Sequence, residues 1–126
     1  MSAPAVVAMR VFVVSDDPLV RDEARYGFPE GVEVEFAADA REAATRLSRR
    51  SPTVVVVDMQ TGNAGGYALT RYMAESKSLA GVPTLVLLER PQDAWLARNA
   101  GATAHRTKPL APGELALAVL ALAKPG

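Results

Sequence analysis

The 126-residue chain contains no cysteine, so a disulfide framework and a thiolate metal site are both excluded. Its 14 basic and 14 acidic residues are interspersed and give a formal net charge of zero. Nucleic-acid-binding domains generally carry a basic surface, so we expect no direct contact with nucleic acid. No apolar run approaches the roughly 20 residues that a membrane span needs, and residues 1–8 lack the charged start of a signal peptide. We therefore expect a cytoplasmic protein without membrane insertion.

An unbroken β-branched run over residues 53–57 closes on Asp58. Such a run is typical of a strand buried on both faces, as in a parallel sheet covered by helices. Asp58 would then lie at the carboxyl end of the strand, at the edge where open α/β sheets bind their ligands. This position makes Asp58 the first candidate for chemistry.

Strand-like and helix-like segments alternate along the rest of the chain, which predicts an α/β fold with a parallel sheet. The composition suits one domain, over residues 9–126, after a lead-in over residues 1–8. Asp39 and Glu42 predict a capping box at the start of the second helix. We expect strands over residues 9–15, 32–37, 53–58, 84–88 and 104–107, and helices over residues 18–28, 39–49, 67–75, 92–100 and 112–123.

Further charged residues follow two other predicted strands. Residues 11–14 form an apolar run that leads into Ser15, Asp16 and Asp17, so two more carboxylates reach the same edge as Asp58. Converging carboxylates repel one another unless a cation neutralises them, and hard oxygen ligands suit a hydrated Mg²⁺. Lys108, after the last strand, can add a positive charge there. The sequence therefore predicts an acidic, magnesium-binding pocket.

These residues together resemble a bacterial response regulator receiver domain across essentially the whole chain. The shared features are Asp16-Asp17, Asp58, Gly66 eight residues later, the turn Ala100-Gly101-Ala102 and the segment Thr107-Lys108-Pro109. The resemblance implies a flavodoxin-like, doubly wound sheet of five parallel strands.

The resemblance also implies roles for the residues of the pocket. Asp58 would accept a phosphoryl group from a histidine kinase, and Lys108 would pair with the phosphoryl oxygens. Asp16, Asp17, Asp58 and the backbone carbonyl of Gln60 would hold Mg²⁺. The protein would then be a phosphoacceptor and binding module rather than an enzyme, with at most weak autodephosphorylation.

Three positions depart from the family pattern. Leu88 stands where receivers carry threonine or serine, and its side chain cannot make the hydrogen bond that couples phosphorylation to loop movement. Glu89 stands where a small residue is usual, and His105 stands at the aromatic switch position. We therefore expect an atypical receiver whose usual switch is impaired or rewired.

The last predicted helix is apolar on all sides, which is unusual for a helix at a protein surface. We expect Leu115, Val119 and Leu122 to dock on the sheet. The residues expected to face outward are Leu117, Leu120 and Ala121, joined by Trp95 of the preceding helix, which we place next to the last one. Exposed apolar side chains of this kind mark interaction surfaces.

This helix-four to helix-five face would bind a target protein or a larger complex, or a second copy in a homodimer. With no output domain expected after the receiver, output would be by protein docking. Two alternatives remain open: a phosphorylation-independent pseudo-receiver adaptor or accessory subunit, and a haloacid-dehalogenase-like phosphatase. The phosphatase family places a second aspartate two residues beyond its nucleophile, where this chain has Gln60.

Overall fold

Strands and helices alternate along the part of the chain that the structure describes, a computed structural model covering residues 9–59 and 65–123. The elements are β1 (Arg10–Val14), α1 (Pro18–Gly27), β2 (Glu33–Ala37), α2 (Ala40–Leu47), β3 (Val54–Met59), α3 (Gly65–Glu75), β4 (Thr84–Leu88), a 3₁₀ helix η1 (Pro91–Asp93), α4 (Ala94–Ala100), β5 (Ala104–Thr107) and α5 (Glu114–Ala123). All strand pairs are parallel, in the order β2-β1-β3-β4-β5. The predicted doubly wound sheet is confirmed. The expected lead-in, residues 1–8, lies outside the described residues.

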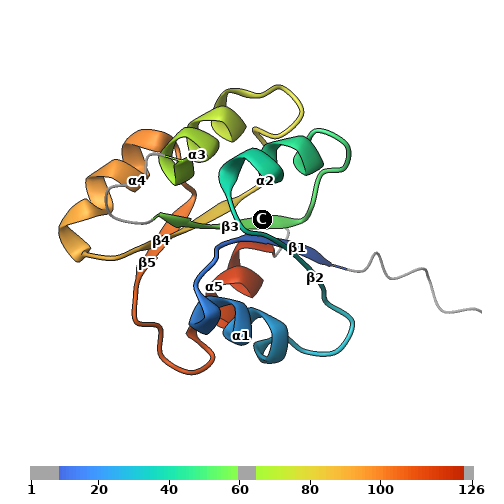
Figure 1. The fold of residues 1–126 in the computed structure, drawn as a ribbon, viewed down its shortest axis with the longest axis vertical. Helices are drawn as coiled ribbons and strands as arrows, with labels where there is room; N and C mark the ends of the chain where they lie inside the picture. The colour runs from blue at the N-terminus through green and yellow to red at the C-terminus, as the bar shows by residue number, and fades with distance from the viewer. Residues whose placement is uncertain (1–8, 60–64, 124–126) are drawn as a thin grey trace, which may run out of the picture.

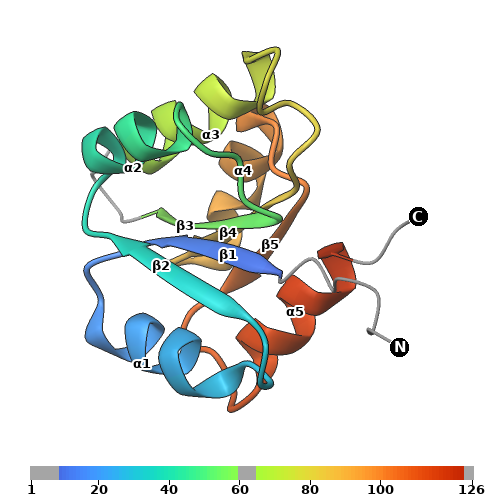
Figure 2. The same ribbon diagram turned by 90° about the vertical axis from the view of Figure 1, so that its right-hand side faces the viewer.

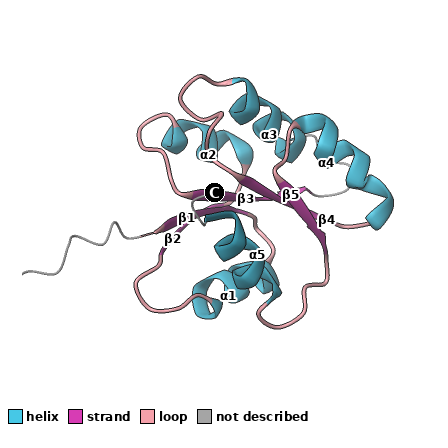
Figure 3. Ribbon diagram, turned by 180° about the vertical axis from the view of Figure 1, so that it is seen from behind, coloured by secondary structure: helices cyan, strands magenta, loops and turns pink. Residues whose placement is uncertain are grey.

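Helices cover both faces of the sheet (Figure 1). α1 and α5 pack on one face, and α2, α3 and α4 pack on the other, as the side view and the view from behind also show (Figures 2 and 3). Two separate hydrophobic clusters result. Because side chains alternate along a strand, Val55 and Val57 enter the cluster under α2, α3 and α4, whereas Val54 and Val56 enter the other. The valine run therefore serves both cores.

α4 and α5 lie in opposite layers, so the expectation that these two helices are neighbours is wrong. Ala97 of α4 belongs to one hydrophobic cluster, whereas Leu115 and Val119 of α5 belong to the other. The edge strand β5 lies between the two layers (Figure 1). A surface that includes both helices must therefore also include β5.

Local sequence signals fix most helix ends. Asp39 caps α2 as predicted and accepts a hydrogen bond from the Glu42 N–H at 2.9 Å. The Glu42 carboxylate, however, accepts from the N–H of Ala38 rather than that of Asp39. α5 begins at Glu114, two residues later than predicted, because Gly113 has a positive φ of 82° that a helix cannot include.

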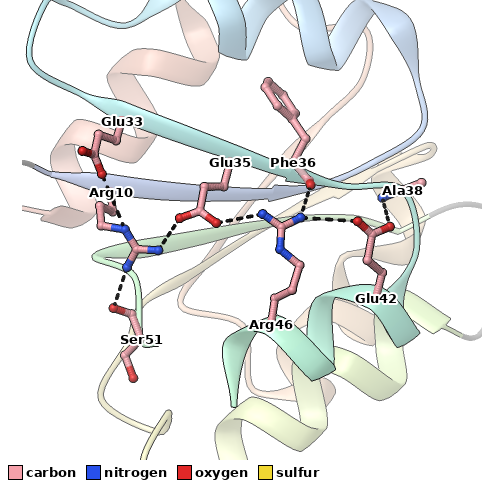
Figure 4. Close-up of polar contacts among 8 residues, drawn as sticks. All are labelled: Arg10, Glu33, Glu35, Phe36, Ala38, Glu42, Arg46 and Ser51. Atoms are coloured by element: carbon pink, nitrogen blue, oxygen red, sulfur yellow. Dashed lines mark hydrogen bonds and ion pairs between the residues drawn. The ribbon is translucent and has the colours of Figure 1, made fainter. Parts of the chain in front are cut away.

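A chain of charged side chains holds the edge strand β2 against its neighbours (Figure 4). Glu35 of β2 accepts hydrogen bonds from Arg10 of β1 and, at 2.8 Å, from Arg46 of α2. Arg46 also donates to the backbone carbonyl of Phe36 at 2.5 Å. These contacts explain why acidic residues alternate with apolar ones in β2. In the described part of the chain, no helix has the length and apolar character to cross a membrane.

Candidate functional site

The site lies where β1 and β3 end side by side, at the point where the strand order reverses. Val14 pairs with Val57 in the parallel ladder, so the residues that follow, Ser15 and Asp58, emerge next to each other. Gly66 lets the start of α3 approach this edge closely. A Cβ at Gly66 would lie 3.2 Å from the backbone carbonyl oxygen of Asp58, so a larger residue would crowd the end of β3. The topology thus delivers Asp58 to the crevice predicted from the sequence.

The side chain of Asp58 is almost completely buried, with 1% of its surface exposed. Its Oδ2 accepts hydrogen bonds from Ser15 Oγ at 2.7 Å and from Lys108 Nζ at 3.1 Å. Its Oδ1 lies 3.0 Å from Lys108 Nζ but has no hydrogen-bond partner among the described residues. Oδ1 is therefore the oxygen of this carboxylate with unused acceptor capacity.

Lys108 is shared among three carboxylates. Its Nζ lies 3.1 Å from Asp17 Oδ2 and 3.6 Å from Glu89 Oε1, in addition to its contacts with Asp58. The Lys108 backbone N–H donates to the Leu88 carbonyl at 2.7 Å, which anchors the residue after β5. Burial disfavours the charged amine, but hydrogen bonds to Asp58 and then Asp17 raise the pKa of Lys108 above its ordinary value. The site therefore contains a fixed positive charge.

Asp17 has a structural task at the start of α1. Its Oδ1 accepts a hydrogen bond from the Leu19 N–H at 2.9 Å, which caps the helix, while its Oδ2 accepts from Lys108. Burial opposes ionisation, but the hydrogen bonds from Lys108 and then from Leu19 lower the pKa of Asp17 below its ordinary value. Both oxygens of Asp17 are therefore engaged.

Asp16 and Asp17 belong to different cavities. Asp16 lines a cavity of about 290 Å³ together with Ser15, Asp58 and Arg41. Asp17 lines a cavity of about 740 Å³ that includes Lys108. The acidic pair that is continuous in sequence is thus divided between two sides of the site.

Donor chemistry at the smaller cavity fits a magnesium ion in part. Asp16 and Asp58 supply carboxylate oxygens, the donors that Mg²⁺ prefers. Gln60 lies outside the described residues. Within residues 9–59 and 65–123, no three acidic, histidine or cysteine side chains converge closely enough to hold a metal ion. The predicted convergence of Asp16, Asp17 and Asp58 on one metal ion is not found among these residues. Asp17 instead accepts hydrogen bonds from the Leu19 N–H and from Lys108, the amine that it shares with Asp58.

The three positions expected to alter the phosphorylation switch, Leu88, Glu89 and His105, differ in burial and in their contacts. Leu88 is 1% exposed and packs in the cluster under α2, α3 and α4. Glu89 is exposed and close enough to Lys108 to compete for its charge. His105 is half-buried on β5, where it pairs with Val86 of β4.

The burial predicted for the apolar residues of α5 is found in part, because Leu120, expected to face outward, and Leu122, expected to dock on the sheet, are both half-buried. Leu115 and Val119 are buried, whereas Leu117 is 72% exposed and Ala121 is exposed. The other two residues expected to face outward are Leu120, which is half-buried, and Trp95 of α4, which is 57% exposed. Of these side chains, Leu117 lines a shallow cavity together with Arg106 of β5.

Ser15 and Arg41 received no role from the sequence. The position of Ser15 could have been predicted. Ser15 directly follows the first strand, so it must lie beside Asp58, which follows the valine run of the neighbouring strand. Arg41 gave no such signal, since only the packing of α2 brings it to the cavity wall.

Known proteins with a similar sequence include regulatory proteins. A family model for the response regulator receiver domain matches residues 11–120. The gliding motility regulatory protein of Myxococcus xanthus is 32% identical over 96% of this chain and 15% of its own length. The virulence transcriptional regulatory protein PhoP of Salmonella typhimurium is 35% identical over 80% of this chain and 46% of its own length. The chain thus spans less than half of these two curated relatives.

Solved structures with the same fold include receiver domains. The signal receiver domain of a signal transduction histidine kinase from Syntrophus aciditrophicus has a TM-score of 0.80 and 28% identity, covering 92% of this chain and 90% of that one. A LuxR-family two-component response regulator from Aurantimonas has a TM-score of 0.76 and 30% identity, covering 90% of this chain and 84% of that one. Both likenesses extend over nearly all of this chain.

Proposed function

Because this chain belongs to the response regulator receiver domain family of two-component signalling, we propose that Asp58 accepts a phosphoryl group from a histidine kinase. The observation that carries the proposal is Asp58 Oδ1, a buried carboxylate oxygen that accepts no hydrogen bond from the described residues and lies 3.0 Å from the Lys108 amine. In the transfer, Oδ1 forms a bond to phosphorus while the bond from phosphorus to its donor breaks. The electron pair of that bond leaves with the donor.

Lys108 has the position and the charge to bind the transferred group. Phosphoryl transfer depends mainly on positioning and on neutralising the charge of the phosphoryl oxygens. Asp16, Asp58 and the backbone carbonyl of Gln60 would hold Mg²⁺, which supplies further neutralisation when it is bound. Asp17 would join them only by giving up its contacts with Lys108 and the α1 cap.

Receiver domains are signalling modules rather than classical enzymes, and we propose for this one an atypical readout with at most weak autodephosphorylation. Leu88 is buried and offers no hydroxyl to a phosphoryl oxygen, and Glu89 competes for Lys108. A modification changes a conformational equilibrium only if it contacts the two states differently.

Leu88 therefore also favours a second candidate function, a phosphorylation-independent adaptor or accessory subunit of a larger complex. Nothing in the described residues favours the phosphatase alternative.

Backbone amide NMR tests the phosphoacceptor role. The protein is titrated with Mg²⁺ and then with beryllofluoride, a phosphoryl mimic, beside an Asp58→Ala control. We expect shifts at Asp16 and Asp58 that are lost in the control. Their spread to His105 and α4 would indicate a working switch, whereas confinement to the pocket would indicate the adaptor. No shift at all would refute phosphoryl binding at Asp58.

We further propose that the outward residues Trp95, Leu117, Leu120 and Ala121 form a docking surface across β5 for a target protein, a larger complex or a second copy. Leu117→Asp should weaken self-association in sedimentation measurements if a homodimer forms. Leu19→Asp on α1 is the matched control, because Leu19 is also 72% exposed. Equal effects of the two substitutions would contradict a specific surface.

The arrangement as a receiver without an output domain and the cytoplasmic location stay predictions.

A further inference from the structure

Ser15 is buried at 3% exposure and held by hydrogen bonds on both sides. Its Oγ accepts from the backbone N–H of Asp17 at 3.0 Å and lies 2.7 Å from Asp58 Oδ2. A hydroxyl carries a single hydrogen, and the N–H of Asp17 can only donate. The Ser15 hydrogen therefore points at Asp58 Oδ2, which makes a short, charge-assisted hydrogen bond.

The backbone fixes this hydroxyl in place before any ligand binds. The Ser15 N–H donates to the carbonyl of Ala37 in β2 at 3.0 Å, so the residue is still held by the sheet. Asp17, which donates to Ser15 Oγ, is itself fixed as the cap of α1. Groups held in this way need no rearrangement during a reaction and act most strongly on charge that develops there.

We infer that Ser15 is a positioning residue that selects which oxygen of Asp58 takes the phosphoryl group and shortens the time for which the group stays. The inference rests on the proposed phosphoacceptor role of Asp58. Lys108 Nζ lies close to both oxygens, 3.0 Å from Oδ1 and 3.1 Å from Oδ2, whereas Ser15 donates to Oδ2. Among the described residues Oδ1 accepts no hydrogen bond, so it is the oxygen with lone pairs available for phosphorus. Ser15 thereby turns the carboxylate in one direction.

Ser15 keeps its partner after the transfer. Oδ2 becomes the carbonyl oxygen of the acyl phosphate, and Lys108 is drawn toward the phosphoryl oxygens, which leaves Ser15 as the donor on Oδ2. In hydrolysis, the oxygen of a water molecule attacks phosphorus and the Oδ1–phosphorus bond breaks. The bonding electron pair returns to the Asp58 carboxylate, and the protons of the water leave with inorganic phosphate. The carboxylate charge that develops is shared by Oδ2, where the Ser15 hydroxyl stabilises it.

Measuring the lifetime of the acyl phosphate tests the inference. The full chain is phosphorylated with acetyl phosphate, the donor is removed, and loss of phosphate is followed in Ser15→Ala, in Ser15→Thr and in the wild type. We expect an about tenfold longer lifetime in Ser15→Ala, the factor given by loss of one charge-assisted hydrogen bond. Ser15→Thr keeps the hydroxyl and should restore the wild-type lifetime. Thr84→Val is a matched control, because it removes a buried hydroxyl at the opposite end of the sheet.

Isotope-edited infrared spectroscopy of phosphorylated Asp58 separates positioning from a structural role. The carbonyl stretch should move to higher frequency in Ser15→Ala and stay in place in Thr84→Val, because only the first loses a donor on Oδ2. If Ser15→Ala does not fold, Ser15→Cys replaces it, and the weaker thiol donor should give an intermediate lifetime. A phosphorylated wild type with an unchanged or shorter lifetime in the variant would overturn the inference alone. A wild type that takes no phosphoryl group at Asp58 would overturn the proposed function and the inference with it.

Discussion

Glu35 offers a sharp test of the charge network that holds the edge strand. Its carboxylate joins Arg10 of β1 to Arg46 of α2, and Arg10 is only 8% exposed (Figure 4). Glu35→Gln keeps the size of the side chain but removes the charge. The Arg10 guanidinium then loses its main counter-ion in a largely buried position.

The geometry sets the expected loss. A hydrogen bond to a charged group contributes about 1.5–3 kcal/mol, and Glu35 accepts two of them. Its side chain is 33% exposed, and glutamine can still accept one bond, so both contributions are reduced. We expect Glu35→Gln to lower the free energy of unfolding by about 2 kcal/mol, or the Tm by about 6–12 °C for a domain of this size.

The effect should depend on pH in a defined direction. The hydrogen bond from Arg10, opposed by burial and helped by Arg46, lowers the pKa of Glu35 below its ordinary value of 4.5. Stabilisation by this carboxylate is therefore complete above pH 4.5 and is lost as the pH falls through the lowered pKa.

Urea unfolding at pH 7 and at lower pH measures both effects. The control is Glu33→Gln, because Glu33 also faces Arg10 but at 3.7 Å and with 59% of its side chain exposed. It should cost less than about 0.5 kcal/mol. Equal losses in the two variants, or a Glu35→Gln deficit that persists at acidic pH, would refute the reasoning.

Three further substitutions probe the surroundings of the site. Gly66→Ala should destabilise the protein by about 1–3 kcal/mol in thermal unfolding, because its Cβ would meet the β3 backbone; Gly27→Ala, with open space around it, should not. Lys108→Gln should cost about 2 kcal/mol in urea unfolding at neutral pH; the loss should fade below pH 3.8 as the pH falls through the lowered pKa of Asp17, and a loss independent of pH would contradict the pairing. Leu88→Thr should cost about 2–4 kcal/mol, since it replaces a buried core leucine, yet enlarge the NMR response to beryllofluoride; a response no larger than that of the parent would refute the proposed loss of the switch.

The sequence predicted β3 and the position of Asp58 correctly, because one pattern indicates both that the strand is buried on two faces and that it lies inside a parallel sheet. A valine run with no polar residue suits a strand covered on both faces, and Asp58, the next-to-last residue of this strand, lies at its carboxyl end, where ligands bind. The charged alternation of β2 similarly predicted an edge strand. These patterns depend on neighbours within one strand, which a sequence displays directly.

Side-chain pairing could not be predicted in the same way. Asp16 and Asp17 look equivalent in the sequence, but only Asp17 lies where its carboxylate can reach both the Leu19 N–H and Lys108. The neighbouring placement expected for α4 and α5 failed for a related reason. Both helices are short and rich in alanine, so their composition does not reveal which face of the sheet each one covers.

Lys108 connects these observations, because one amine serves Asp17, Asp58 and Glu89. A phosphoryl group on Asp58 must draw this amine away from the other two carboxylates. Asp17 can release it, since the Leu19 N–H still satisfies the helix cap. Glu89 holds it from 3.6 Å and is exposed, so water can solvate the carboxylate once the amine moves. Ser15 stays on Oδ2 throughout, because its donor and acceptor contacts do not involve Lys108. Under the proposed phosphoryl transfer, charge at this site would therefore be redistributed through the lysine, while the serine would keep the orientation of Asp58.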